Sequence, residues 1–251
     1  MTAPVMPGAE PWSAPGGPHG ALVLHGFTGC PQSMRGLAQA FAAAGFAVEL
    51  PLLPGHGTAV DDMIPTRWSD WSATAERAYQ DLAGRCDKVV VAGLSMGGTL
   101  ASWLAAAHPE VAGAVLVNPA VEPPAESFVE MMSKALEAGS ETIPGVGGDL
   151  ADPDAHELAY DLVPVRAALS LWDALVDLAP RLGEIRSPVL LMTSPNDHVV
   201  PPSAGDFFTE RVSGPVERVM LERSYHVATL DYDRGDIEDR AAAFARAVTS
   251  G

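Results

Sequence analysis

Residues 89–98 read Val-Val-Val-Ala-Gly-Leu-Ser-Met-Gly-Gly, and the rest of the chain is arranged around this stretch. The apolar run at its start is typical of a buried strand, and residues 99–107 follow with a helical pattern. A serine at such a junction makes a sharp turn that lifts its hydroxyl above the sheet edge, while glycines at 93 and 97 avoid collisions with the neighbouring strand and helix. Free N–H groups at the helix start would stabilise negative charge near Ser95. Gly-x-Ser-x-Gly also occurs by chance, but the flanking strand and helix favour a nucleophilic serine.

The same alternation of strands and helices continues on both sides of this stretch. Before it, strands are predicted at 21–24 and 46–50, with helices at 32–44 and 67–83. After it, strands are predicted at 111–117, 189–193 and 216–221, with helices at 167–178, 203–212 and 237–248. This rhythm predicts an α/β fold whose mostly parallel sheet is covered by helices on both faces. No internal repeat or second domain is evident, so we expect residues 1–251 to form a single domain.

The regular alternation of predicted strands and helices stops after Asn118. Residues 121–166 contain glycines, prolines and aspartates, with short amphipathic pieces at 128–136 and 156–162. The segment is too long for a simple crossover between strands, and an insertion over the carboxyl ends of strands usually forms a lid or cap. We therefore predict a cap insertion at about 121–166.

Amino-acid composition and net charge argue against several kinds of partner and location. The chain has 251 residues and a formal net charge of −17, which disfavours nucleic acid and anionic membrane surfaces as partners. Two cysteines, Cys30 and Cys86, make no disulfide framework, and residues 1–20 lack the pattern of a signal peptide. No apolar run reaches the roughly 18 residues that a membrane span needs. The sequence thus predicts a cytoplasmic protein without a membrane segment, and it leaves the oligomeric state open.

A nucleophilic serine needs a base, and the base needs a carboxylate that orients it. In this fold class the acid and then the histidine follow the serine, each on a loop after a late strand. Asp197 follows the predicted strand 189–193, and His226 follows the strand 216–221. His198 is adjacent to the acid, His108 ends a helix where it can act as a cap, and His56 precedes the serine. We therefore predict the triad Ser95, Asp197 and His226.

Two backbone N–H groups should stabilise the negative oxygen that forms during catalysis. One belongs to the residue after the nucleophile, Met96, and the other lies in the loop after the first buried strand, where we choose Phe27. His25 lies in the same loop, and a structural role that pins this loop is the favoured interpretation for its ring. Nothing in the sequence resembles a metal site, and no cofactor is expected.

Five segments carry a family resemblance: His25–Gly29, Pro54–Thr58, Gly93–Gly98, Asp197–Pro202 and Ser224–Asp233. From Gly20 onward the chain resembles the bacterial monoacylglycerol lipases and related small carboxylesterases of the α/β-hydrolase family. The resemblance implies an α/β-hydrolase fold, hydrolysis of acylglycerols or simple short- to medium-chain esters, a mobile cap and the oxyanion pair at Phe27 and Met96. It also implies that Glu157 contacts the glycerol head, although an ordinary solvated helix residue is an equally good interpretation. Residues 127–145 match poorly, so the acyl-chain length stays open.

The expected reaction is two-step acyl transfer through an acyl-enzyme on Ser95. Apolar cap residues would seat the acyl chain of a small-molecule ester, although plain cap packing explains any one of them equally well: Met131, Met132, Leu136, Ile143 and Val146. Rival functions on the same triad are general carboxylester, thioester or carbon–carbon bond hydrolysis. A non-catalytic receptor on the same fold is a further rival, but it would not need a complete triad.

Overall fold

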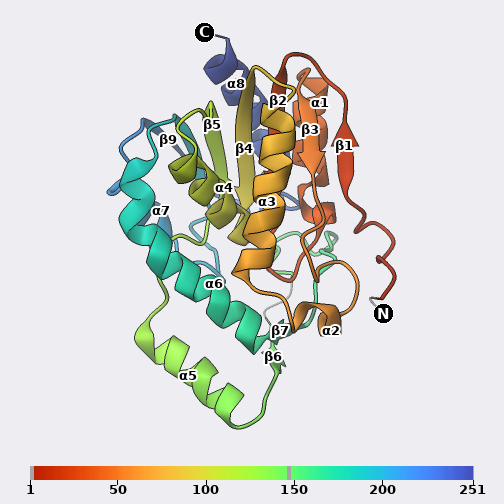
Figure 1. Cartoon of the computed structure of the whole chain (residues 1–251), viewed down its shortest axis with the longest axis vertical. Coiled ribbons are helices and arrows are strands. Elements are labelled where there is room, and N and C mark those ends of the chain that lie inside the picture. Colours follow the sequence, from red (N-terminus) through yellow and green to blue (C-terminus); the bar gives the residue numbers. More distant parts are fainter. Residues whose placement is uncertain (1–2, 146–147, 251) are drawn as a thin grey trace.

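The computed structural model describes residues 3–145 and 148–250. Strands from these residues form a seven-stranded sheet with the order β1-β3-β2-β4-β5-β8-β9 (Figure 1). Among the described strands of this sheet, only the short edge strand β1 runs antiparallel to its neighbour. The strands are β1 (Trp12–Ala14), β2 (His19–Leu24), β3 (Ala47–Leu50), β4 (Lys88–Leu94), β5 (Gly113–Val117), β8 (Val189–Thr193) and β9 (Val216–Met220).

The central strands are largely apolar because both of their faces are covered. In β2, Leu22 and Leu24 point into one core and Ala21 and Val23 into the other. The same alternation runs through β4, β5 and β8, as expected for strands whose successive side chains point to opposite faces. The continuous apolar runs in the sequence therefore correspond to a parallel sheet buried between two helical layers.

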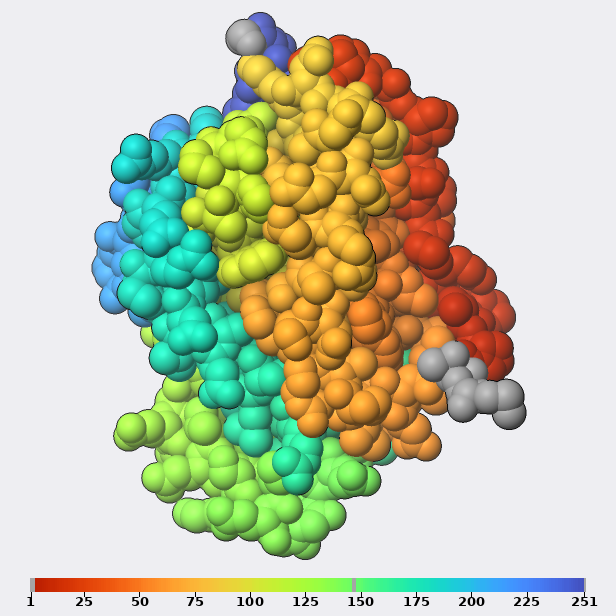
Figure 2. Space-filling model, viewed as in Figure 1, coloured from red at the N-terminus to blue at the C-terminus, as the bar shows by residue number. Residues whose placement is uncertain are grey.

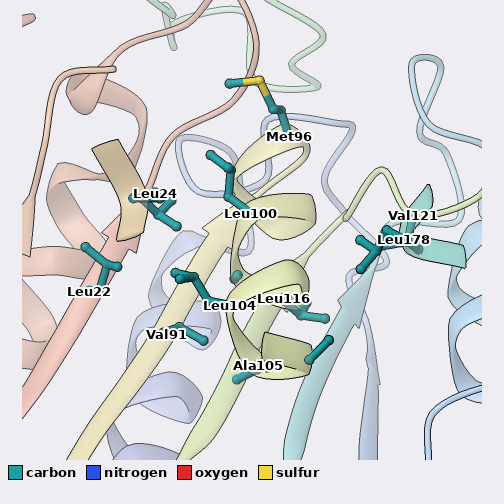
Figure 3. Packing of buried hydrophobic residues seen from close by; sticks show 14 of the residues in the cluster. Leu22, Leu24, Val91, Met96, Leu100, Leu104, Ala105, Leu116, Val121 and Leu178 are labelled. Atoms are coloured by element: carbon teal, nitrogen blue, oxygen red, sulfur yellow. The ribbon is translucent and has the colours of Figure 1, made fainter. Parts of the chain in front are cut away.

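The helices divide between the two faces of the sheet. On one face lie η1 (Pro31–Met34), α1 (Arg35–Ala43) and α8 (Arg234–Thr249). On the other lie α3 (Trp68–Ala83), α4 (Met96–Ala107), α6 (Val165–Leu178), η2 (Ala179–Glu184) and α7 (Ser203–Thr209). The short helix α2 (Val60–Met63) precedes α3. Figure 3 shows side chains of α4, among them Leu100 and Leu104, packed close to β2, β4 and β5.

The segment between β5 and α6 lies at one end of the molecule, where its green residues form the lower end of Figures 1 and 2. It contains α5 (Glu126–Glu137) and the strands β6 (Thr142–Pro144) and β7 (Leu162–Pro164), which pair antiparallel. We call this segment, residues 121–164, the cap. A small apolar cluster around Met132, Val165 and Ala168 joins α5 to α6, so α6 links the cap to the body.

Most predicted elements are confirmed, with shifts at several ends, and two corrections bear on the site. Helix α4 begins at Met96 rather than at residue 99, directly after the serine. The amphipathic piece predicted at 156–162 is wrong, because residues 155–160 have no regular structure and β7 starts at Leu162. The Gln32 side chain bonds the carbonyl of His156 and the N–H of Leu158, which fixes this stretch against the body in a non-helical form.

Within the described ranges, no helix has both the length and the apolar character needed to cross a membrane. A cytoplasmic location stays a prediction.

Candidate active site

Ser95 occupies the sharp turn between β4 and α4. Its backbone has φ 55° and ψ −119°, a conformation that non-glycine residues rarely adopt and that commonly marks functional sites. Three backbone–backbone hydrogen bonds hold it there: the Ser95 N–H donates to the Val117 carbonyl at 3.1 Å, and the Ser95 carbonyl accepts from the N–H groups of Thr99 and Ala120 at 3.1 and 3.2 Å. While its neighbours are buried, Ser95 itself stays partly exposed. The strained turn therefore presents the hydroxyl outward.

The turn requires glycine on both sides of Ser95. A Cβ on Gly93 would lie 2.0 Å from the Gly97 carbonyl oxygen, and one on Gly97 would lie 2.0 Å from the Leu24 carbonyl oxygen. Both neighbours are backbone atoms, so no side-chain movement could relieve the collision. The two glycines of the Gly-x-Ser-x-Gly pattern are therefore required for steric reasons, as expected from the sequence.

Ser95 opens into a cavity of about 780 Å³ at the carboxyl ends of the strands. His226, Glu157 and Asp149 also line it. The remaining wall is mainly apolar and comes from the cap, α6 and the loop before α7, with residues that include Phe128, Met132, Ile143, Val163, Leu171, Trp172, Leu175, Val199 and Val200. A cavity of this size and character can hold an extended apolar group beside the serine.

His226 and Asp197 form a close pair. The His226 Nδ1 lies 2.7 Å from Asp197 Oδ2, and the two side chains are only 8% and 2% exposed. Asp197 Oδ1 accepts the N–H groups of Val199 and Val200, each at 2.8 Å, which leaves Oδ2 directed at the histidine. With its proton on Nδ1, the neutral ring has a free lone pair on Nε2 that can take a proton.

The structure therefore brings Asp197 to His226, and it brings His226 and Ser95 to one cavity. Across residues 3–145 and 148–250, no hydrogen bond joins Ser95 Oγ to His226 Nε2. In many ligand-free enzymes this bond is long and tightens only when substrate binds.

The two predicted oxyanion donors lie on opposite sides of Ser95 in the sequence. Met96 is the first residue of α4, so its N–H has no partner within the helix. Its side chain is buried at the sheet end of the core (Figure 3). Phe27 lines the cavity, and the next residue, Thr28, has a positive φ of 63° that bends the loop.

His25 is fully buried and holds its loop, in line with the structural role predicted for it. Its Nδ1–H donates to the Gly26 carbonyl at 2.9 Å, and its Nε2 accepts the Leu53 N–H at 3.1 Å. Burial lowers the pKa of His25 to about 4, so the ring is neutral at physiological pH. Two other histidines bind carboxylates other than Asp197: His108 contacts Glu76, and His198 contacts Asp149.

Glu157 lies on the cavity wall, although the stretch around it is not helical. Burial raises the pKa of this carboxyl, and the nearby His226 opposes the shift. Gly29 makes room for it, because a Cβ there would lie 2.9 Å from Glu157 Oε1. A second, more polar cavity of about 520 Å³ shares Glu157 and Gly148 with the first.

Only some of the described residues proposed to seat the acyl chain line the cavity. Ile143 and Met132 lie on the cavity wall, while Met131 is 49% exposed on the outside of α5. Leu136 is partly buried against the small cluster of the cap. Val146 lies outside the described residues.

Asn118 is a functional candidate that the sequence reasoning missed. Its buried side chain donates to the carbonyls of His226 and Tyr225 at 2.8 and 3.2 Å and to Ser194 Oγ at 2.9 Å, and it accepts the Ser194 N–H at 2.7 Å. It thereby joins the acid loop to the histidine loop. Its φ of 41° is a conformation that asparagine tolerates better than most residues, and an asparagine at a strand end was the available signal.

Comparison with known proteins is consistent with this geometry. The family model described as "Serine aminopeptidase, S33" matches residues 18–233. A thermostable monoacylglycerol lipase of Bacillus sp. (strain H-257) is 43% identical over 96% of both chains, and a carboxylesterase of Bacillus subtilis (strain 168) is 25% identical over 90% of this chain and 91% of its own. A solved structure reported among the metagenome-derived lipolytic enzymes LipS and LipT has a TM-score of 0.93 at 40% identity. It covers 97% of this chain and all of the other.

The sheet order, the serine turn and the match over most of the chain agree with one another. The chain therefore belongs to the α/β-hydrolase family described as serine aminopeptidase, S33.

Proposed function

We propose that this protein is a serine hydrolase that cleaves carboxylic esters, with monoacylglycerols as the preferred substrates. The observation that carries the proposal is that His226, paired with Asp197, lines the same apolar cavity as the strained Ser95. The monoacylglycerol lipase from Bacillus at 43% identity supports the choice of substrate class. The products would be a fatty acid and glycerol, and the reaction needs no cofactor.

In the first step, His226 Nε2 takes the Ser95 proton as Oγ attacks the ester carbonyl carbon. The Phe27 and Met96 N–H groups stabilise the resulting oxyanion. The intermediate collapses to an acyl-enzyme, and His226 gives its proton to the leaving alcohol. In the second step, His226 takes a proton from water, the hydroxide attacks the acyl carbon, and Ser95 leaves with the proton as the acid is released. Asp197 holds the tautomer and stabilises the charged imidazole.

Substitution of Ser95 tests this assignment. Ser95→Ala should lower kcat on monoacylglycerols by about 10⁶-fold, as for other triad nucleophiles, without loss of the fold. An organophosphonate should label Ser95 alone in the wild-type protein, since this hydroxyl has the paired base. Peptide mapping by mass spectrometry reads out the label. Wild-type turnover in Ser95→Ala, or a label on Ser194 with loss of activity, would contradict the assignment.

Glu157 distinguishes a monoacylglycerol lipase from a general carboxylesterase. We propose that its carboxylate accepts hydrogen bonds from the glycerol hydroxyls, an interaction worth about 1.5–3 kcal/mol when one partner is charged. Glu157→Ala should therefore lower kcat/KM about ten- to hundredfold on monoacylglycerols. It should leave p-nitrophenyl esters of the same chain length almost unchanged, because they have no glycerol to hold. Equal losses on both substrates would show that Glu157 supports the protein rather than the substrate, and no loss on either would favour the general carboxylesterase.

A further inference from the structure

We infer that Asp149, a carboxylate of the cap, is a positioning residue that fixes the backbone of His226 and the loop of Asp197. The inference rests on the proposed function, in which these two residues act on Ser95. Asp149 lines the same cavity, but its oxygens are used by the protein itself.

The first contact is with His226. Asp149 Oδ2 accepts the backbone N–H of His226 at 3.1 Å, and the Asp149 backbone carbonyl accepts the N–H of Val227 at 3.1 Å. The carbonyl of His226 is bound from the body by the Asn118 side chain at 2.8 Å. Side chains thus hold both backbone polar groups of His226. Asp149 of the cap binds the N–H, and Asn118 at the end of β5 binds the carbonyl.

The second contact is with the acid loop. The same Oδ2 accepts the backbone N–H of His198 at 3.1 Å, and Oδ1 lies 2.8 Å from His198 Nδ1. His198 directly follows Asp197 in the chain. One carboxylate therefore joins the two loops whose side chains meet in the 2.7 Å bond between His226 and Asp197.

Asp149 can act in this way because its own segment is fixed. The buried carboxylate of Asp231 accepts the N–H groups of Ala151 and Asp152 at 2.7 and 3.0 Å. The same carboxylate accepts the N–H of Tyr225, which precedes the histidine, at 2.9 Å. The cap stretch and the histidine loop are therefore cross-linked by a carboxylate from each side.

The role predicted from this geometry is placement of the imidazole rather than supply of charge. A catalytic group misplaced by about 1 Å can lose 10²-fold in rate. In Asp149→Asn, the amide oxygen can still accept the two backbone N–H groups, and the exposed ring of His198 can adapt to the amide nitrogen. In Asp149→Glu the charge is kept, but the longer side chain displaces the acceptor.

The experiment compares Asp149→Ala, Asp149→Asn and Asp149→Glu with the wild type. Asp152→Ala is the matched control: it removes the same charge from the same segment, and its side chain accepts the N–H of Asp154 instead of touching the triad loops. For each protein, kcat and KM are measured on a monoacylglycerol and on a p-nitrophenyl ester. Titration with an organophosphonate counts the competent Ser95 sites, so that kcat is expressed per active site.

We expect Asp149→Ala to lower kcat per active site at least tenfold on both substrates, with KM within about twofold of the wild type. Asp149→Asn should stay within about threefold of the wild type and above Asp149→Glu, while Asp152→Ala should match the wild type. If Asp149→Ala does not fold, the order of the Asn and Glu variants decides the question.

Three results would overturn the inference: equal rates in Asp149→Ala and Asp152→Ala, a Glu variant more active than the Asn variant, or a loss that appears only as fewer titratable sites. A wild-type protein that is not labelled at Ser95 and hydrolyses no ester would overturn the proposed function, and the inference with it.

Discussion

At the scale of single residues, Asn118 shows how a buried amide can organise two loops. It lies at the end of β5, beside the strand that carries Ser95, and its side chain bonds Ser194, Tyr225 and His226. A buried polar group that loses its partner costs about 1–3 kcal/mol, since it has already given up its bonds to water. Removal of this one side chain would take away the hydrogen-bond partner of the Ser194 N–H and of the His226 carbonyl.

We therefore predict that Asn118→Ala lowers the free energy of unfolding by about 2–4 kcal/mol. The positive φ at this position adds to the loss, because alanine tolerates it less well than asparagine. Asn196→Ala, at an exposed position of the same acid loop, is the control and should change stability by less than about 0.5 kcal/mol. Chemical denaturation measures both. Equal stabilities of the two variants would show that the amide network contributes little.

Some residues of the candidate site could be predicted from the sequence, and others could not. Asp197 and His226 were predictable, because chain order and strand-end position restrict where an acid and a base can lie. The 2.7 Å bond between them agrees with that expectation. The hydrogen-bond networks of Asn118 and Asp149 were not predictable, since their side-chain partners lie 76 or more and 49 or more positions away in the chain.

At the scale of secondary structure, the strand, turn and helix around Ser95 depend on the close approach of backbone segments. Gly97 contacts the end of β2, and Gly93 contacts the first turn of α4. The strands themselves were predictable, because burial on both faces leaves a continuous apolar run. The stretch at 155–160 was not, since its conformation is set by the Gln32 side chain of η1 rather than by its own pattern.

Gly97→Ala should be strongly destabilising. The added Cβ would lie 2.0 Å from the Leu24 carbonyl oxygen, and the central strand β2 cannot move without breaking its pairing with β4. We expect a loss of about 3 kcal/mol or more in the free energy of unfolding, at or beyond the upper end for overpacking. Thermal and denaturant unfolding of the purified variant measure the loss.

Gly235→Ala is the control for this substitution. Gly235 is exposed in α8, and a Cβ there meets nothing within 4 Å. Alanine in a helix should stabilise the protein by up to about 1 kcal/mol. If Gly97→Ala were as stable as Gly235→Ala, the steric account of the serine turn would be wrong.

At the scale of the whole molecule, two buried histidines couple stability to pH. Burial lowers the pKa of His25 to about 4 and that of His56 to about 3, where the neighbouring His25 adds to the shift. In the unfolded chain, histidine titrates near 6.5. As the pH falls below about 6.5, the unfolded chain therefore binds protons that the folded protein does not yet bind. The stability present above this pH is lost progressively down to about pH 4 for His25 and about pH 3 for His56.

His56→Phe should weaken this dependence. The phenyl ring can keep the edge contacts to Phe27 and Trp71, and the Pro54 carbonyl keeps the hydrogen bond from Trp71 Nε1 at 3.0 Å. Between pH 4.5 and 6, the slope of the unfolding free energy against pH should fall by about 1 kcal/mol per pH unit, close to one proton. Denaturant titrations at several pH values measure the slope. An unchanged slope would mean that His56 is not the buried neutral group described above.

The pairing of β5 directly with β8 has a consequence for how such a protein can diverge. The cap leaves the sheet after one strand and the chain returns to the neighbouring one, so no strand register depends on the length of the cap. The entropy cost of closing a longer loop grows only with the logarithm of its length. Over evolutionary time the cap can therefore be lengthened, trimmed or replaced, and substrate range can drift while the hydrolytic centre is inherited intact. The stretch with Asp149 would be the exception, because a newly acquired cap that lacked its carboxylate would loosen the inherited histidine loop.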